Sequence, residues 1–300
     1  MIIKDNRRTL SLIILIAFAF NVIMFCAAFP QTVKPESTVL ARDFSAYYIA
    51  EWRLFHNPNI IYLGGIQKGD CKILPQPQTF KYPPASLLLF APFLTLNYQT
   101  SLTAFDFLQV ALIPILSFFV YSIVKDKSII LGSVAAVIVI AEPLPSLFIG
   151  GSFLNIQSFG PAYYCAYSLA NAHVLQTILL VGALYCGFTN KPWFSALLFA
   201  FGILDPRAAV LALPLLLWYN RHSVIKFLGG LVLFISVTNL PFFLYHGIGF
   251  SFLRMELNGQ TVSQLYQYDW IPIYSIAALT IIEAISLFQQ KKMPQKNCKN

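Results

Sequence analysis

The sequence predicts an all-α polytopic membrane protein, and three observations support this fold class. The 300 residues are 57% hydrophobic and 11% charged, with 27 phenylalanines, which is more apolar material than the core of a soluble domain requires. Several apolar runs approach the roughly 20 residues that a helix needs to cross a hydrocarbon core of about 30 Å. The net charge of +8 comes from basic residues in short loops and tails, a membrane pattern that does not indicate nucleic acid binding.

The first apolar run covers residues 10–29 and follows Lys4, Arg7 and Arg8. The run is long and has no small-residue cleavage site, so we interpret it as a retained span and not as a signal peptide. Basic residues accumulate on the cytoplasmic side of membrane proteins. We therefore expect the N-terminus in the cytoplasm and the first span to run outward.

The next full-length apolar run, residues 102–124, ends at the basic pair Lys125 and Lys127. If that pair is cytoplasmic, residues 30–100 form a large first loop on the extracytoplasmic side. Within that loop, residues 85–96 are too few for a span. We interpret them as an interfacial helix.

The remaining spans are expected within residues 101–288, and residues 289–300 form a cytoplasmic tail. They are predicted at residues 102–124, 129–149, 169–188, a hairpin of 193–204 and 208–219, then 224–245 and 271–288. Twelve of the 20 basic residues then face the cytoplasm, whereas the eight outside are interspersed with acids. Residues 1–300 are therefore predicted to form one multi-pass domain in the cell membrane, with both termini cytoplasmic.

Cysteine and histidine spacing predicts no metal site. The five cysteines are scattered, and neither they nor the four histidines show the spacing of metal ligands. Cys71 and Cys165 both fall on the predicted outer side. A disulfide between them and two unpaired thiols remain open alternatives.

The candidate chemistry begins in the predicted outer loop, where an aromatic-rich helix is expected from Asp43 to the breaker segment that ends at Pro58. Helical spacing places Tyr47 and Glu51 on the same face as Asp43. A second face carries aromatic residues: Phe44, Tyr48, Trp52 and Phe55. This pattern is typical of an interfacial helix with its acids toward water. Asp43 is interpreted either as a helix N-cap, a role that Asp fills well, or as a reactive carboxylate, and the two roles are compatible.

These segments together resemble glycosyltransferase family 87, the polyprenyl-phosphate-sugar-dependent mannosyltransferases of the GT-C superfamily. The resemblance covers roughly residues 8–220 and rests on an Asp-Phe-x-x-Tyr-Tyr-x-Ala motif followed by Phe-x-Tyr-Pro-Pro. The matching residues are Asp43, Phe44, Tyr47, Tyr48, Ala50, Tyr62, Phe80, Tyr82, Pro83, Pro84 and Pro92. Family members are generally longer, so the chain is similar to a short or C-terminally reduced member with a GT-C-like helix bundle.

The resemblance implies a hexosyltransferase that moves a sugar, most simply mannose, from a polyprenyl-phosphate carrier to a hydroxyl of a glycan or glycolipid acceptor. Asp43 would be the general base. Arg207, at the outer turn of the hairpin, and Lys81 would hold the donor phosphate. For Lys81 a solvated or snorkelling side chain is an equal alternative. Tyr47, Tyr48, Glu51 and Tyr82 would support the site.

Acids within predicted spans are further candidates, because an ionisable residue in a membrane is costly and often functional. Glu142 precedes Pro143, and such helix breaks tend to line cavities, so Glu142 is included among the supporting residues. Glu283 is interpreted as structural.

No cofactor is expected, because the donor itself carries the activated sugar. The expected partners are membrane lipid and the two substrates, and not nucleic acid. The sequence identifies no protein partner. The alternative function is a non-catalytic polytopic protein, either a lipid-binding or assembly subunit or a transporter.

Overall fold

The computed structural model describes residues 11–12, 15–16, 18–19, 22–23, 26, 42–70, 79–141, 172–204, 206–257 and 270–292. Within these ranges the regular structure is entirely helical. Its α-helices are α2 (Arg42–His56), α3 (Leu87–Leu94), α4 (Tyr98–Val124), α5 (Ile129–Ala141), α8 (His173–Phe188), α9 (Pro192–Gly202), α10 (Pro206–Tyr219), α11 (Val224–Leu244), α12 (Ile248–Leu257) and α13 (Trp270–Lys292). Short 3-10 turns are η1 (Pro58–Ile60), η2 (Pro84–Ser86) and η3 (Arg221–Ser223).

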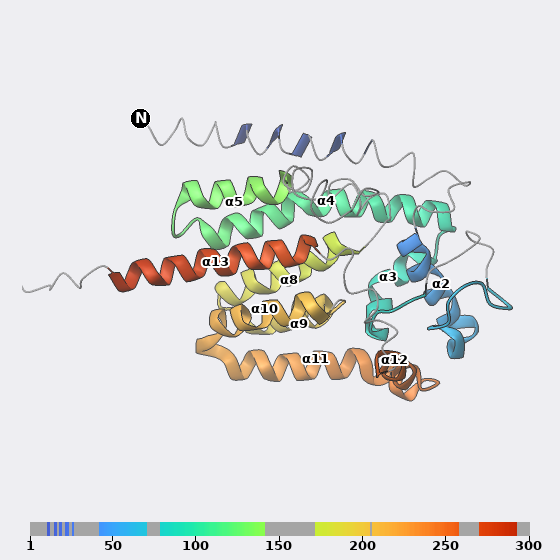
Figure 1. Cartoon of the computed structure of the whole chain (residues 1–300). Coiled ribbons are helices and arrows are strands. Elements are labelled where there is room, and N and C mark those ends of the chain that lie inside the picture. The colour runs from blue at the N-terminus through green and yellow to red at the C-terminus, as the bar shows by residue number, and fades with distance from the viewer. Residues whose placement is uncertain are drawn as a thin grey trace, which may run out of the picture.

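The longer helices run alongside one another as an elongated bundle (Figure 1). Helix α8 lies at its centre and contacts α4, α9, α10 and α13, while α5 packs on α4 and α11 packs on α9. The short helices α2, α3 and α12 gather at one end of the bundle (Figure 1). We call α2, α3, α12, the turns η1 and η2 and the described connecting segments 61–70 and 79–83 the cap. The opposite end, where α4 turns into α5, α8 into α9 and α10 into α11, is called the loop end.

Two helical segments are long and apolar enough to cross a membrane among the described residues, Tyr98–Val124 and Arg221–Leu244. The first contains the predicted span 102–124 and begins four residues earlier because the Asn97 side chain caps it, accepting a hydrogen bond from the Thr100 backbone N–H at 3.0 Å. Five further apolar stretches in the described part of the chain have 10–17 residues, one of them Ile276–Leu287 within the 23-residue α13. The hairpin helices α9 and α10 have 11 and 14 residues. Since a full span needs about 20 residues, these helices are shorter than a typical span.

Helix α3 agrees with the expectation that residues 85–96 form no span. It has only eight residues, which at about 1.5 Å per residue cover less than half of a hydrocarbon core. Other predicted segments extend beyond what the structure describes. Residues 142–149 of one predicted span lie outside it, and of residues 10–29 only short helical pieces are described.

Two hydrophobic clusters hold the described helices together. The larger runs along the bundle and joins α4, α8, α9, α10, α11 and α13 through buried side chains that include Val120, Val181, Phe199, Leu216, Phe227 and Leu279. The second joins the cap to the bundle through Phe44, Tyr47, Phe90, Phe105, Ala172, Leu204, Phe242, Ile248 and Met255. The cap is therefore positioned by packing against the ends of α4, α8, α9 and α11.

The outer surface of the bundle remains strongly apolar. Large hydrophobic side chains are exposed on several helices, among them Phe107, Ile115 and Phe118 on α4, Phe194 on α9, Val210 on α10, and Ile225, Val232 and Val237 on α11. Soluble proteins seldom expose contiguous apolar surface on this scale.

Candidate functional site at the cap end of the bundle

Helix α2 positions the candidate carboxylate. The helix begins at Arg42, so Asp43 lies in its first turn, where the helix dipole stabilises a negative charge. The Asp43 side chain is half-buried. The next residue, Phe44, is fully buried and stacks on Phe105 of α4 with the ring centroids 5.1 Å apart. This contact fixes the start of α2 against the bundle and so fixes the position of Asp43.

The Asp43 carboxylate is near enough to Lys81 and Tyr47 to affect the pKa of both. Desolvation lowers the pKa of Lys81, and the negative charge of Asp43 opposes that shift. The pKa of Tyr47 is raised well above its usual value, first by burial and then by the neighbouring Tyr82 and Asp43. Two of the three residues predicted to act as the base or to bind the donor phosphate, 38 positions apart in the sequence, therefore come together at the cap.

Tyr47 links three elements at this point. Its hydroxyl donates a hydrogen bond to the Tyr82 hydroxyl at 2.9 Å and accepts one from the backbone N–H of Ala172, at the start of α8, at 3.4 Å. Its ring stacks on Phe90 of α3, with the centroids 4.2 Å apart. Sequence reasoning had placed Tyr47 and Tyr82 near the site but had given no role to the start of α8.

The Tyr-Pro-Pro segment sets the position of Lys81 and Tyr82. A residue that precedes proline is restricted to extended backbone, and Pro83 has φ −53° and ψ 143°. Pro84 then opens the turn η2, where its missing N–H is not needed. The Ser86 hydroxyl donates to the Pro83 carbonyl at 2.7 Å. The chain thus turns into α3 directly after Lys81 and Tyr82.

Glu51 differs from expectation, whereas Tyr48 packs with the predicted aromatic face. Tyr48 donates its hydroxyl to the Leu96 carbonyl at 2.9 Å and packs edge-on against Tyr98, so it ties α2 to the turn before α4. Glu51 was expected on a solvated face, yet it is only 2% exposed. Burial raises its pKa to about 8. The prediction that the acids of this helix face water is therefore wrong for Glu51, because the cap encloses α2 on nearly every side.

The cap also contains an ion pair that sequence reasoning missed. The Arg53 guanidinium donates to both carboxylate oxygens of Asp70, at 3.0 and 2.6 Å, and its other hydrogens go to backbone carbonyls of Ile60, Leu63 and Gly65. The Arg53 and Asp70 side chains are 1% and 3% exposed. The pair fastens the loop after α2 onto the helix, and the bidentate geometry is one that only arginine provides.

The remaining predicted site residues are placed in part or not at all. Arg207 is the second residue of α10, while its side chain lies outside what the structure describes. Leu204, three residues earlier, is buried in the same cluster as Tyr47, so the turn between α9 and α10 lies at the cap end (Figure 1). Glu142, Cys71 and Cys165 lie outside the described residues.

The described cap brings together groups suited to acid–base chemistry on an anionic substrate. Asp43 is a carboxylate that water can reach, Lys81 is a neighbouring amine, and the hydrogen-bonded Tyr47 and Tyr82 hold the segments that carry them. Comparison with models of known families, with curated proteins and with solved structures finds no match for this chain.

Proposed function

We propose that this chain is an integral membrane glycosyltransferase with a GT-C-like helix bundle. It would move a hexose, mannose by the family resemblance, from a polyprenyl-phosphate carrier to a hydroxyl acceptor with inversion. The observation that carries the proposal is the convergence of Asp43, Lys81 and Tyr47 at the cap. A carboxylate beside a cation matches what the reaction needs, namely a base for the acceptor and a counter-charge for the leaving phosphate.

The membrane setting is supported by the surface of the bundle. Two helices are long enough to span a bilayer, and exposed apolar side chains extend over several others. Helices without a water-facing polar side are stable where lipid surrounds them. Lys125, Lys191 and Arg221 all follow or precede helices at the loop end, so the positive-inside rule assigns that end to the cytoplasm and the cap to the outer face.

In the proposed reaction Asp43 accepts the proton of the acceptor hydroxyl. The hydroxyl oxygen attacks the anomeric carbon as the bond from that carbon to the phosphate oxygen breaks, and the polyprenyl phosphate leaves with the electron pair. Lys81 and Arg207 would stabilise the charge that develops on the phosphate. Tyr47 would hold the Tyr-Pro-Pro segment and the start of α8 in place, and Glu142 is kept as a supporting residue on its sequence position before Pro143 alone.

The test is the variant Asp43→Asn. It keeps the size of the side chain and its capping ability but removes the base. We expect sugar transfer from a synthetic polyprenyl-phosphate mannose to a mannoside acceptor to fall by about two to four orders of magnitude, with the folded protein still present in the membrane. Transfer is measured as radiolabelled product in membranes that contain equal amounts of each protein.

Asp126→Asn is the matched control, because Asp126 is an exposed aspartate at the loop end and loses the same charge. It should retain the parent's rate. If Asp43→Asn also retains that rate, Asp43 acts only in helix α2 and the base assignment is wrong. If the parent transfers neither mannose nor glucose, the non-catalytic alternative of a lipid-binding or assembly subunit, or a transporter, takes its place.

A further inference from the structure

Helix α12 is apolar on two opposite sides, and only one side is accounted for by the fold. Ile248 and Met255 are buried in the cap cluster, and Phe252 packs against the Tyr62 ring with the centroids 5.8 Å apart. On the other side Phe250, Leu253 and Leu257 are 64%, 45% and 87% exposed. A ten-residue helix that only covered the cap would need no such outer face.

The position of α12 is fixed by the preceding turn. His246 and Gly247 both adopt positive φ, 51° and 63°, and reverse the chain directly after α11. Gly249 lies so close to the Phe243 ring that a Cβ would come within 2.6 Å of it. The Phe243 and Phe250 rings meet edge to face, 5.1 Å apart. This turn and these ring contacts therefore set the orientation of α12 relative to α11.

This geometry places α12 at a membrane surface in the proposed setting. The segment Arg221–Leu244 is long enough to cross the hydrocarbon core, so the helix that follows its end lies at the depth of the lipid headgroups. Leu244 and Tyr245 at the turn are exposed as well. Tyrosine is enriched at this depth.

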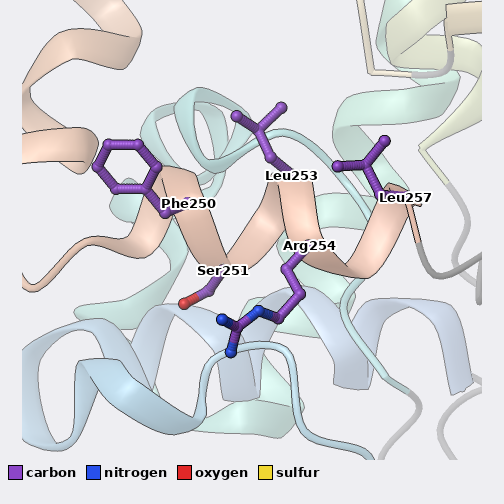
Figure 2. A pocket seen from close by; sticks show the side chains of 5 residues that line it. All are labelled: Phe250, Ser251, Leu253, Arg254 and Leu257. Atoms are coloured by element: carbon purple, nitrogen blue, oxygen red, sulfur yellow. The ribbon is translucent and has the colours of Figure 1, made fainter.

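A hollow of about 520 Å³ lies along the outer face and is lined by Phe250, Ser251, Leu253, Arg254 and Leu257. Figure 2 shows the three apolar side chains pointing away from Ser251 and Arg254, and all five residues are exposed. The Arg254 side chain is exposed. Apolar side chains next to a guanidinium and a hydroxyl complement a lipid with an anionic headgroup, since the acyl chains contact the former and the phosphate the latter.

We propose that α12 is an interfacial docking surface for anionic phospholipid of the outer leaflet, with Arg254 binding the headgroup phosphate. The inference rests on the membrane orientation under the proposed function but not on sugar transfer. One arginine near a charged bilayer surface contributes about 1 kcal/mol, which corresponds to roughly a fivefold preference for anionic over zwitterionic lipid.

The experiment uses the full chain in nanodiscs that contain equal amounts of phosphatidylglycerol and phosphatidylcholine. In each preparation one of the two lipids carries a photoreactive group near the headgroup, and crosslinks are mapped by mass spectrometry. We expect labelling of Ile248–Leu257 by phosphatidylglycerol to exceed labelling by phosphatidylcholine about fivefold. Arg254→Gln should abolish the preference, Arg254→Lys should keep most of it, and Leu257→Ser should lower labelling by both lipids.

Arg221→Gln is the matched control. Arg221 is also exposed but lies at the loop end over the Trp218 ring, so its loss should leave the labelling of α12 unchanged. Equal labelling of parent and Arg254→Gln by phosphatidylglycerol, or no labelling of α12 by either lipid, overturns the inference. Asp43→Asn should label like the parent, so a failed transfer assay and a failed docking surface give separate results.

Discussion

At the scale of single residues, the buried carboxyl of Glu51 makes stability depend on pH. Its pKa is about 8 in the folded protein, raised by burial from 4.5. The folded state then holds a proton that the unfolded chain releases at lower pH. The stability from this proton is complete below about pH 4.5 and is lost as the pH rises through about 8. A difference of one pKa unit between the folded and unfolded states corresponds to about 1.4 kcal/mol in the free energy of unfolding.

We therefore expect Glu51→Gln to unfold with a flatter pH dependence than the parent across this window and to be the more stable of the two at its alkaline end. Thermal unfolding of the purified protein in detergent at a series of pH values measures the effect. Asp126→Asn, which alters an exposed acid, should follow the parent's slope. Parallel curves for Glu51→Gln and the parent would show that Glu51 is already ionised in the folded protein.

Residue types and spacing could predict part of the site. The order of Asp43 and the Tyr-Pro-Pro segment was enough to group Asp43, Tyr47, Lys81 and Tyr82. Helical periodicity correctly put Glu51 on the side of Tyr47, but it could not show that the cap covers that side. The burial of Glu51 depends on contacts between segments distant in sequence, and no local pattern records them.

At the scale of elements, an ion pair joins three segments near the loop end. The Lys127 ammonium, after α4, lies 2.5 Å from a Glu283 carboxylate oxygen on α13, and the Tyr219 hydroxyl at the end of α10 donates to the same carboxylate. The interpretation of Glu283 as structural agrees with these contacts. The Lys127 Nζ atom is buried in this arrangement, but Lys127 lies in the turn after α4 on a long side chain, whereas Glu283 lies within α13, so the two partners depend on the pair to different degrees.

This difference predicts that Lys127→Met destabilises the bundle more than Glu283→Gln does, by about 1–3 kcal/mol. Without the lysine, a carboxylate stays buried with only the tyrosine hydroxyl. Without the carboxylate, the lysine can extend to the membrane surface, and the glutamine still accepts from Tyr219. Unfolding midpoints of both variants and of the double variant, which should recover part of the loss, measure the coupling.

Lys125→Met provides the control, since Lys125 lies in the same turn with an exposed side chain. If Lys125→Met and Lys127→Met are equally stable, the ion pair contributes nothing to stability.

Helix boundaries show a limit on prediction from sequence. The end of α4 at Val124 was predicted to the residue, whereas its start moved to Tyr98 because hydropathy does not detect the Asn97 cap.

At the scale of the whole molecule, the alternation of helix directions was predictable from charge alone. Basic residues occur where α4, α8 and α10 end, and these three turns lie at the same end of the bundle (Figure 1). The cap was less predictable. No helix was predicted between the spans 224–245 and 271–288, yet this segment contains α12, which at ten residues is too short to be recognised as a span.

The orientation of the bundle gives the last prediction. In a background without the five native cysteines, single cysteines replace Asn59 and Lys68 at the cap and Lys125 and His222 at the loop end. All four native side chains are exposed, so access depends on the membrane. A membrane-impermeant maleimide added to intact cells should label the two cap positions, because the positive-inside rule keeps the basic turns in the cytoplasm. The loop-end positions should react only after permeabilisation. Labelling of position 125 in intact cells would show that the bundle has the opposite orientation, with Asp43 on the cytoplasmic face.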